Sequence, residues 1–274
     1  MSVSQSDKAD RFRALHQGAR AFVIPNPWDA GSARVLAALG FQALATSSGA
    51  SAGVLGKRDG QVTREEAIAH ARAIAEATDL PVSGDLEKGF GDAPEAAAQT
   101  IRLAAEAGLV GCSIEDATGD PNKPLYDIGH AVERIAAAAL AARSLGFAFT
   151  LTARAENFIR GNPNLDDTIK RLQAFEQAGA DVLFAPGLPD IAAVRTVCAS
   201  IGKPFNFMVG IKGKSFSVAT LEAAGVKRIS LASSLYRAAM SGLAAAAQEI
   251  RDGGTFGYLE RSLTTAELND LMRN

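Results

Sequence analysis

Apolar and polar positions along this chain follow two alternating patterns. Short apolar or β-branched runs recur, and each is followed by an alanine-rich segment whose apolar residues are spaced as on one face of a helix. The expected strands are Ala21 to Asn26, Phe41 to Ser48, Pro81 to Glu87, Gly111 to Asp116, Ala148 to Glu156, Asp181 to Gly187, Pro204 to Gly210 and Arg228 to Ser234. The helices between them include Thr63 to Thr78, Ala93 to Ala107, Gly129 to Ala142, Asp166 to Ala178 and Val218 to Ala224.

Eight strand-helix units in this order favour a parallel barrel over an open doubly wound sheet. No GxGxxG motif follows the first strand, so a dinucleotide-binding fold lacks its fingerprint. We therefore predict an α/β fold, a single (β/α)8 TIM barrel over residues 1–274. Residues 253–274 form a C-terminal helical extension, with Thr264 or Thr265 capping a helix over Ala266 to Met272.

Composition narrows the choice of partners. Hydrophobic residues make up 47% of the chain and charged residues 21%, which is ordinary for a globular protein. No apolar run reaches the length of a membrane span, and the N-terminus lacks the features of a secretory signal. The formal net charge is −2, which offers no field for nucleic acid or an anionic membrane. We expect a cytoplasmic protein whose partner is a small molecule.

The cysteines and histidines are too scattered to form a zinc site. Cys112 and Cys198 show no CxxC spacing, and they are expected to be free buried thiols. The histidines show no HxH or HExxH spacing either. Any metal ion must therefore be held by oxygen ligands.

Acidic residues gather where strands are expected to end, and in a barrel that is where active sites form. Asp85 and Glu87 end the third strand and are expected on the same side because side chains alternate. Glu115 ends the fourth strand, and Asp59 follows the second. Like charges that converge need a compensating cation, and Mg²⁺ suits an oxygen-only shell that keeps waters. Each acid taken alone could equally be a solvated loop residue or a salt-bridge partner.

Three further features offer substrate contacts. Arg154, at the end of the fifth strand, could bind a carboxylate or phosphate with its planar fork, or pair structurally with the acids. The small-residue segment Ser47 to Gly53 is expected to be a loop whose backbone N–H groups could cradle an anionic oxygen. Asn206, in the seventh strand, could orient substrate or satisfy the core backbone.

Together these segments resemble the phosphoenolpyruvate mutase/isocitrate lyase superfamily along nearly the whole chain. The likeness rests on the order and spacing of Pro27-Trp28-Asp29-Ala30-Gly31-Ser32-Ala33, Ser48-Gly49-Ala50, the Asp59 loop, Asp85-Leu86-Glu87-Lys88-Gly89-Phe90-Gly91, Ile114-Glu115-Asp116 and Ala153-Arg154. It implies an enzyme dependent on Mg²⁺, or on Mn²⁺, that cleaves a C–C bond of a small α-keto or α-hydroxy carboxylic acid through an enolate-like intermediate. It also implies a homo-oligomer, a dimer or tetramer, in which the C-terminal helices reach a neighbouring subunit.

The resemblance also implies roles for individual residues. Asp85 would be the principal metal ligand, and Asp59, Glu87 and Glu115 would hold metal-bound waters. Ser48, Gly49, Ala50 and Arg154 would bind substrate, and Asn206 is added to this group from its place in the seventh strand. Arg154 would be catalytic, and Asn122 and Lys123, which loosely echo the polar loop of the mutase and phosphonopyruvate hydrolase branch, are the other catalytic candidates.

Departures from the family pattern leave the reaction open. The loop Ala117 to Tyr126 has no cysteine or histidine where isocitrate and methylisocitrate lyases carry a Lys-Lys/Arg-Cys-Gly-His motif, which disfavours those two activities. Three alternatives stand beside C–C cleavage: a P–C bond mutase or phosphonopyruvate-type hydrolase, a phosphosugar aldolase or isomerase, and a barrel that binds keto acids without turnover. Gly210, Gly213 and Ser233-Ser234 lie where barrels often bind phosphate.

Overall fold

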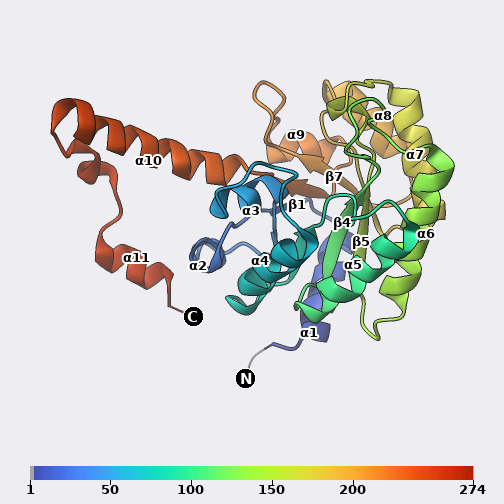
Figure 1. Ribbon diagram of the computed structural model, residues 1–274, viewed down its shortest axis with the longest axis horizontal. Coiled ribbons are helices and arrows are strands. Elements are labelled where there is room, and N and C mark those ends of the chain that lie inside the picture. Colours follow the sequence, from blue (N-terminus) through green and yellow to red (C-terminus); the bar gives the residue numbers. More distant parts are fainter. Residues whose placement is uncertain (1–2, 274) are drawn as a thin grey trace.

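The computed structural model describes residues 3–273 and shows a barrel of eight parallel strands surrounded by helices (Figure 1). The strands are paired in the order β1-β8-β7-β6-β5-β4-β3-β2. Their bounds are β1 Phe22–Ile24, β2 Leu44–Ala45, β3 Val82–Asp85, β4 Gly111–Glu115, β5 Thr150–Arg154, β6 Val182–Phe184, β7 Phe205–Met208 and β8 Arg228–Ser230. Each lies within a strand expected from the sequence, so the predicted barrel is confirmed.

The helices begin and end close to the positions that the sequence indicates. They are α1 Gln5–Gln17, α2 Ala30–Ala38, α3 Ser48–Val54, α4 Arg64–Glu76, α5 Pro94–Glu106, α6 Ile128–Arg143, α7 Leu165–Gln177, α8 Ile191–Ser200, α9 Val218–Ala223, α10 Ser234–Gly253 and α11 Thr265–Leu271. Local chemistry fixes several starts. In α4, for example, Thr63 and Glu66 form a reciprocal capping box that satisfies two N–H groups at the helix start.

The barrel closes between β1 and β2 through few contacts. The backbone N–H of Ala45 donates to the carbonyl of Pro25 at 3.0 Å. The side chain of Asn26 completes the join, because its Nδ2 donates to the carbonyl of Thr46 at 2.8 Å and its Oδ1 accepts from the N–H of Leu231 at 2.9 Å. One buried amide therefore ties the residues that follow β1, β2 and β8 together.

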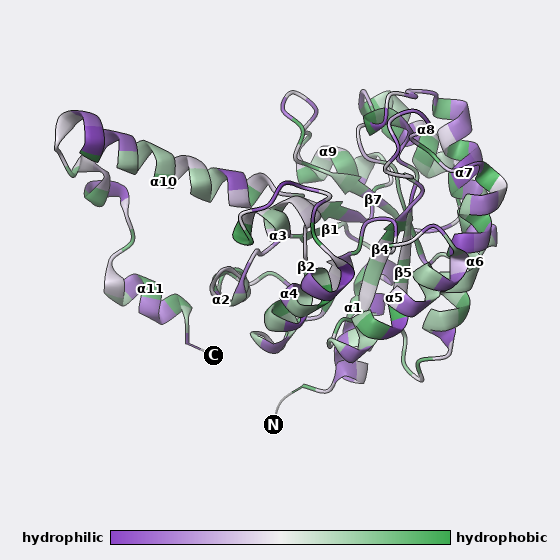
Figure 2. Cartoon of the chain, in the orientation of Figure 1, coloured by the Kyte–Doolittle hydropathy of each residue, from purple (hydrophilic) through white to green (hydrophobic). Residues whose placement is uncertain are grey.

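Apolar side chains fill the space between the strands and the surrounding helices, which show green inner faces and purple outer faces in Figure 2. The N-terminal end of the barrel is covered by α1. Phe12 packs against Phe22 of β1 and lies close to Gly111 at the start of β4, across the barrel. The opposite, C-terminal end is left open for a site.

The C-terminal extension begins at Ser234, earlier than residue 253, and projects from the barrel as an arm (Figure 1). Helix α10 has no buried residue, and Met240, Leu243 and Ile250 are exposed on it. The arm returns to the barrel only at its end, where Arg34 of α2 donates to the carbonyl of Met272 at 3.2 Å. No helix within residues 3–273 combines the length and apolarity needed to cross a membrane.

Candidate active site

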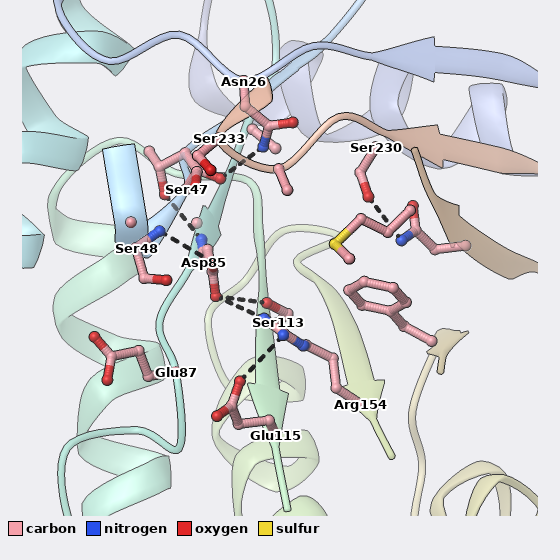
Figure 3. A pocket seen from close by; sticks show the side chains of 18 of the residues that line it. Asn26, Ser47, Ser48, Asp85, Glu87, Ser113, Glu115, Arg154, Ser230 and Ser233 are labelled. Carbon is pink, nitrogen blue, oxygen red and sulfur yellow. Dashed lines mark hydrogen bonds and ion pairs between the residues drawn. The ribbon is translucent and has the colours of Figure 1, made fainter. Parts of the chain in front are cut away.

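A cavity of about 420 Å³ lies at the C-terminal ends of the strands. Eight residues predicted from the sequence line it, and Figure 3 shows several of them together: Ser48, Gly49, Asp59, Asp85, Glu87, Glu115, Arg154 and Asn206. Ala50, Asn122 and Lys123 do not line it. Ala50 is fully buried, whereas Asn122 and Lys123 are exposed and Lys123 pairs with Asp127 at 2.6 Å. The catalytic role of these two loop residues stays a prediction.

Asp85 is the last residue of β3, and hydrogen bonds hold both its backbone and its carboxylate. Its N–H donates to Thr46 Oγ1 at 2.8 Å, while its Oδ2 accepts from the N–H of Ser48 at 3.1 Å. Its Oδ1 lies 2.9 Å from Nη1 of Arg154 and 3.5 Å from Ser113 Oγ. The carboxylate is therefore fixed at the centre of the strand ends.

Arg154, at the end of β5, is the hub of a buried charge cluster. Its Nη2 lies 2.8 Å from Glu156 and 3.3 Å from Glu115, in addition to the Asp85 pair. Arg160 contacts the same two glutamates at 3.4 and 3.2 Å. Burial raises the pKa of the Glu115 carboxyl, and the charge of Glu156 adds to the effect. These ion pairs agree with the prediction that Arg154 pairs structurally with the acids. The guanidinium also lines the cavity, so it can contact a substrate as well.

Glu87 reaches the same cavity by a different route from the one predicted. Strand β3 ends at Asp85, and Glu87 lies beyond it with φ of 48°, so strand alternation does not place it. Burial and the charges of Asp85, Glu115 and Asp59 raise the pKa of Glu87 to about 7. This wall of the cavity therefore carries more negative charge than Arg154 offsets.

The small-residue segment after β2 is a helix, α3, so its prediction as a loop was wrong. Gly and Ser residues have weak helix propensity, which hides the helix in the sequence. The fold imposes it, because Ser51 N–H donates to the Ser47 carbonyl at 2.8 Å and starts the helical ladder. The N–H of Ser48 is bonded to Asp85 and so does not point freely at an anion.

Asn206, on β7, is held by its neighbours. Its Nδ2 donates to Ser230 Oγ at 3.0 Å, and its Oδ1 accepts from Nε of Arg228 at 2.8 Å. Arg228 and Ser230 of β8 also line the cavity, and our sequence analysis missed them. The sequence does contain a signal for these two residues. An arginine and a serine two positions apart in a strand place both polar side chains on the same face.

Among residues 3–273, no three His, Cys, Asp or Glu side chains are placed to hold a metal ion directly. The acids nevertheless form an oxygen-only donor set around one cavity. Both thiols are free and neither lines the cavity, but only Cys112 is buried as predicted, because Cys198 in α8 is half-buried.

Comparisons with known proteins agree with this geometry. The family model of phosphoenolpyruvate phosphomutase matches residues 12–251. The 2,3-dimethylmalate lyase of Eubacterium barkeri is 31% identical, covering 96% of this chain and 93% of its own. A solved protein of Burkholderia cenocepacia, described only as a lyase/mutase, is 50% identical with a TM-score of 0.95, covering 97% of this chain and 96% of its own.

A phosphonopyruvate hydrolase, solved in complex with oxalate and Mg²⁺, shares the fold with a TM-score of 0.86 at 22% identity, covering 96% of this chain and 94% of its own. The family match and the lyase relative extend over most of the chain and include every strand that contributes to the cavity. This chain belongs to the phosphoenolpyruvate mutase/isocitrate lyase superfamily.

Proposed function

We propose that this protein is a Mg²⁺-dependent enzyme that cleaves a C–C bond of a small α-keto or α-hydroxy carboxylic acid, as a lyase, decarboxylase or hydrolase. The observation that carries the proposal is the convergence of Asp85, Glu87, Glu115 and Arg154 on one cavity at the C-terminal ends of β3, β4 and β5. The guanidinium of Arg154 can bind an anionic ligand, and the neighbouring carboxylates can bind a cation that the same ligand contacts.

The residues fit a hard divalent cation. Burial first, and then the charges of Asp85, Glu115 and Asp59, raise the pKa of Glu87, and a cation at this wall would favour its ionised form. Asp85 would be the principal ligand, and Asp59, Glu87 and Glu115 would hold bound waters; Mn²⁺ could replace Mg²⁺. When bound, the ion would supply Lewis-acid polarisation of a substrate oxygen.

Arg154 would hold the substrate's carboxylate and stabilise enolate charge. Its Nη1 donates one N–H to Asp85, which leaves the second N–H of that nitrogen for a ligand. Its three carboxylate neighbours fix the guanidinium plane, so the donor does not have to reorganise as charge develops. On the opposite edge of Asp85, Gly49 and the hydroxyl of Ser48, whose N–H is already bonded to Asp85, would contact the same carboxylate or the keto oxygen.

Relatives support this class of chemistry without naming a substrate for this chain. One relative is a lyase by name, and a hydrolase of the same fold was solved with oxalate, a stable mimic of pyruvate enolate. Cleavage or rearrangement of a P–C bond is the second candidate, because the matching family model is that of a phosphomutase.

Turnover over a panel of α-keto and α-hydroxy acids, with and without EDTA, tests the proposal. We expect EDTA-sensitive cleavage of a carbon acid, with pyruvate or a related keto acid among the products. Phosphonopyruvate as the only substrate would support the second candidate. Binding of keto acids without any turnover would leave a non-catalytic keto-acid-binding barrel.

We also propose that the protein is a cytoplasmic homo-oligomer in which α10 packs on a second copy of the chain. The apolar residues Met240, Leu243 and Ile250 recur at helical spacing on one face of α10. A single copy leaves that face in water, whereas exchange of arms between two copies would cover both faces by symmetry.

A further inference from the structure

Helix α3 contacts two of the acids that we propose hold the metal ion. The backbone N–H of Ser48, its first residue, donates to Oδ2 of Asp85 at 3.1 Å. Gly49 follows, and a Cβ added there would lie 3.4 Å from Oδ2 of Asp59, so this carboxylate packs directly against the helix. A shift of α3 would therefore move a hydrogen-bond donor of one acid and the packing surface of the other.

The other end of α3 packs against the side chain of Tyr236. A Cβ added at Gly53 would lie 2.5 Å from the hydroxyl oxygen of Tyr236 and 2.6 Å from its Cε1, which is closer than real Cβ atoms come. Glycine therefore lets the ring approach the helix backbone directly. Gly49 and Gly53 are four residues apart and share one face of the helix. Asp59 and Tyr236 thus pack along the same face of α3.

Tyr236 is held in place by contacts outside α3. It lies in the first turn of α10, where that helix leaves the barrel beside α3 (Figure 1). Nη2 of Arg237, the next residue, donates to the carbonyl of Gly210 at 2.5 Å. The ring of Trp28 meets the tyrosine ring edge-on, with the ring centroids 5.7 Å apart. The start of the arm is therefore fixed to the segments that follow β1 and β7, and the Tyr236 ring is its contact with α3.

Helix α3 needs such a contact, because its own residues stabilise it weakly. Serine, glycine and valine, which have weak helix propensity, make up most of its seven residues. A helix this short depends on packing against the rest of the protein. Its buried residues, Ala50, Ser51 and Ala52, have small side chains, and Val54 at its end is exposed.

We propose that Tyr236 is a positioning residue for the metal site and acts through α3. Its ring packs on Gly53 and fixes the helix, whose first turn then holds Asp85 and Asp59 in place for the ion and its waters. Tyr236 itself does not line the cavity, so its effect is indirect. This inference rests on the proposed function, which assigns the metal ion to these acids.

Calorimetric titration with Mn²⁺ measures the effect of the ring. Tyr236→Ala should bind Mn²⁺ about 10-fold more weakly than wild type, at the lower end of the loss expected for residues that support a ligand. Tyr236→Phe should bind as wild type does, because the ring still contacts Gly53 and Trp28. The control Tyr258→Ala removes a half-buried tyrosine of the same arm, in the short 3-10 helix Gly257–Arg261 beyond α10, and should leave the affinity unchanged.

Gly53→Ala tests the same contact from the side of α3. The added methyl group would displace the ring, so Mn²⁺ affinity should fall by a similar factor although alanine favours the helix. In the double variant Tyr236→Ala/Gly53→Ala the two losses should not add, since the methyl group then has no ring to displace. Losses that add in full would contradict a shared route through this contact.

The outcomes separate this inference from the proposed function. A wild-type protein that binds no Mn²⁺ or Mg²⁺ would overturn both. Mn²⁺ binding by wild type that neither Tyr236→Ala nor Gly53→Ala weakens would overturn the inference alone, whatever the melting temperatures of the variants. If Tyr236→Ala does not fold, Tyr236→Leu keeps apolar bulk without the ring, and wild-type Mn²⁺ affinity in that variant would also overturn the inference.

Discussion

Replacing Asp85 by Asn should abolish metal binding while the protein remains folded. The change keeps the shape of the side chain but removes the charge that faces Arg154 at 2.9 Å. Charge-assisted hydrogen bonds are worth about 1.5–3 kcal/mol each. Two effects offset the loss: Arg154 keeps Glu115 and Glu156, and the repulsion that raises the pKa values of Glu87 and Glu115 is reduced.

We therefore expect the free energy of unfolding to fall by only about 1–2 kcal/mol, which corresponds to a few degrees in melting temperature for a chain of this size. Calorimetric titration with Mn²⁺ should show affinity reduced more than about 100-fold, beyond the effect of residues that only support a ligand. Single removal of Asp59, Glu87 or Glu115 should cost less.

Asp116 provides the matched control. It directly follows β4, it is buried, and it pairs with Arg171 at 3.0 Å outside the cavity. Asp116→Asn should lose more stability, about 2–4 kcal/mol, because Arg171 keeps only Asp167, and it should bind Mn²⁺ as wild type does. Wild-type metal affinity in Asp85→Asn, or equal metal loss in both variants, would refute the assignment.

Four other expectations can be measured directly. Oxalate should bind only with Mg²⁺ present and lose affinity in Arg154→Ala or in EDTA; binding that does not depend on the metal contradicts this. A Cys112→Ser/Cys198→Ser protein should keep most of its turnover, since burial raises both thiol pKa values and neither thiol lines the cavity; a folded, inactive double variant would oppose it. Burial lowers the pKa of His16 from 6.5 to about 3, so between these pH values the unfolded chain binds a proton that the folded chain excludes. The free energy of unfolding should therefore fall below about pH 6.5 by up to about 1.4 kcal/mol per pH unit. Denaturation curves of His16→Leu should lose this pH dependence. Light scattering should find a dimer or tetramer at micromolar concentration that Leu243→Glu dissociates, and a wild-type monomer would disprove the arm exchange.

The barrel could be predicted from the sequence because each strand-helix unit carries its own periodic pattern. Strand ends are also informative, since acids such as Asp85 and Glu115 follow apolar residues that must be buried. The helix α3 could not be predicted, because Ser, Gly and Ala in Ser48–Val54 have no apolar stripe and only the contacts after β2 impose the helix. Glu87 was placed in the cavity for the wrong reason, since the strand ends before it.

Arg228 shows a different limit of sequence interpretation. Among residues 3–273 no carboxylate pairs with Arg228, and its hydrogen-bond partners from β5 and β7 come together only when the barrel closes. A count of charges along the chain cannot distinguish an arginine in a neutral setting from one in an ion-pair cluster. Asn122 and Lys123 are exposed on their loop, so their catalytic role stays a prediction.

The join between β1 and β2 has a consequence for how binding and unfolding are linked. Asn26, Thr46 and Asp85 all line the cavity, and Asn26 is also the amide that closes the ring. A ligand bound in the cavity would contact residues on both sides of the β1–β2 junction, which has few hydrogen bonds. It would therefore add contacts that hold the barrel closed. Occupancy should therefore raise the resistance of the whole barrel to opening, since a ligand that binds only the closed form stabilises it by mass action.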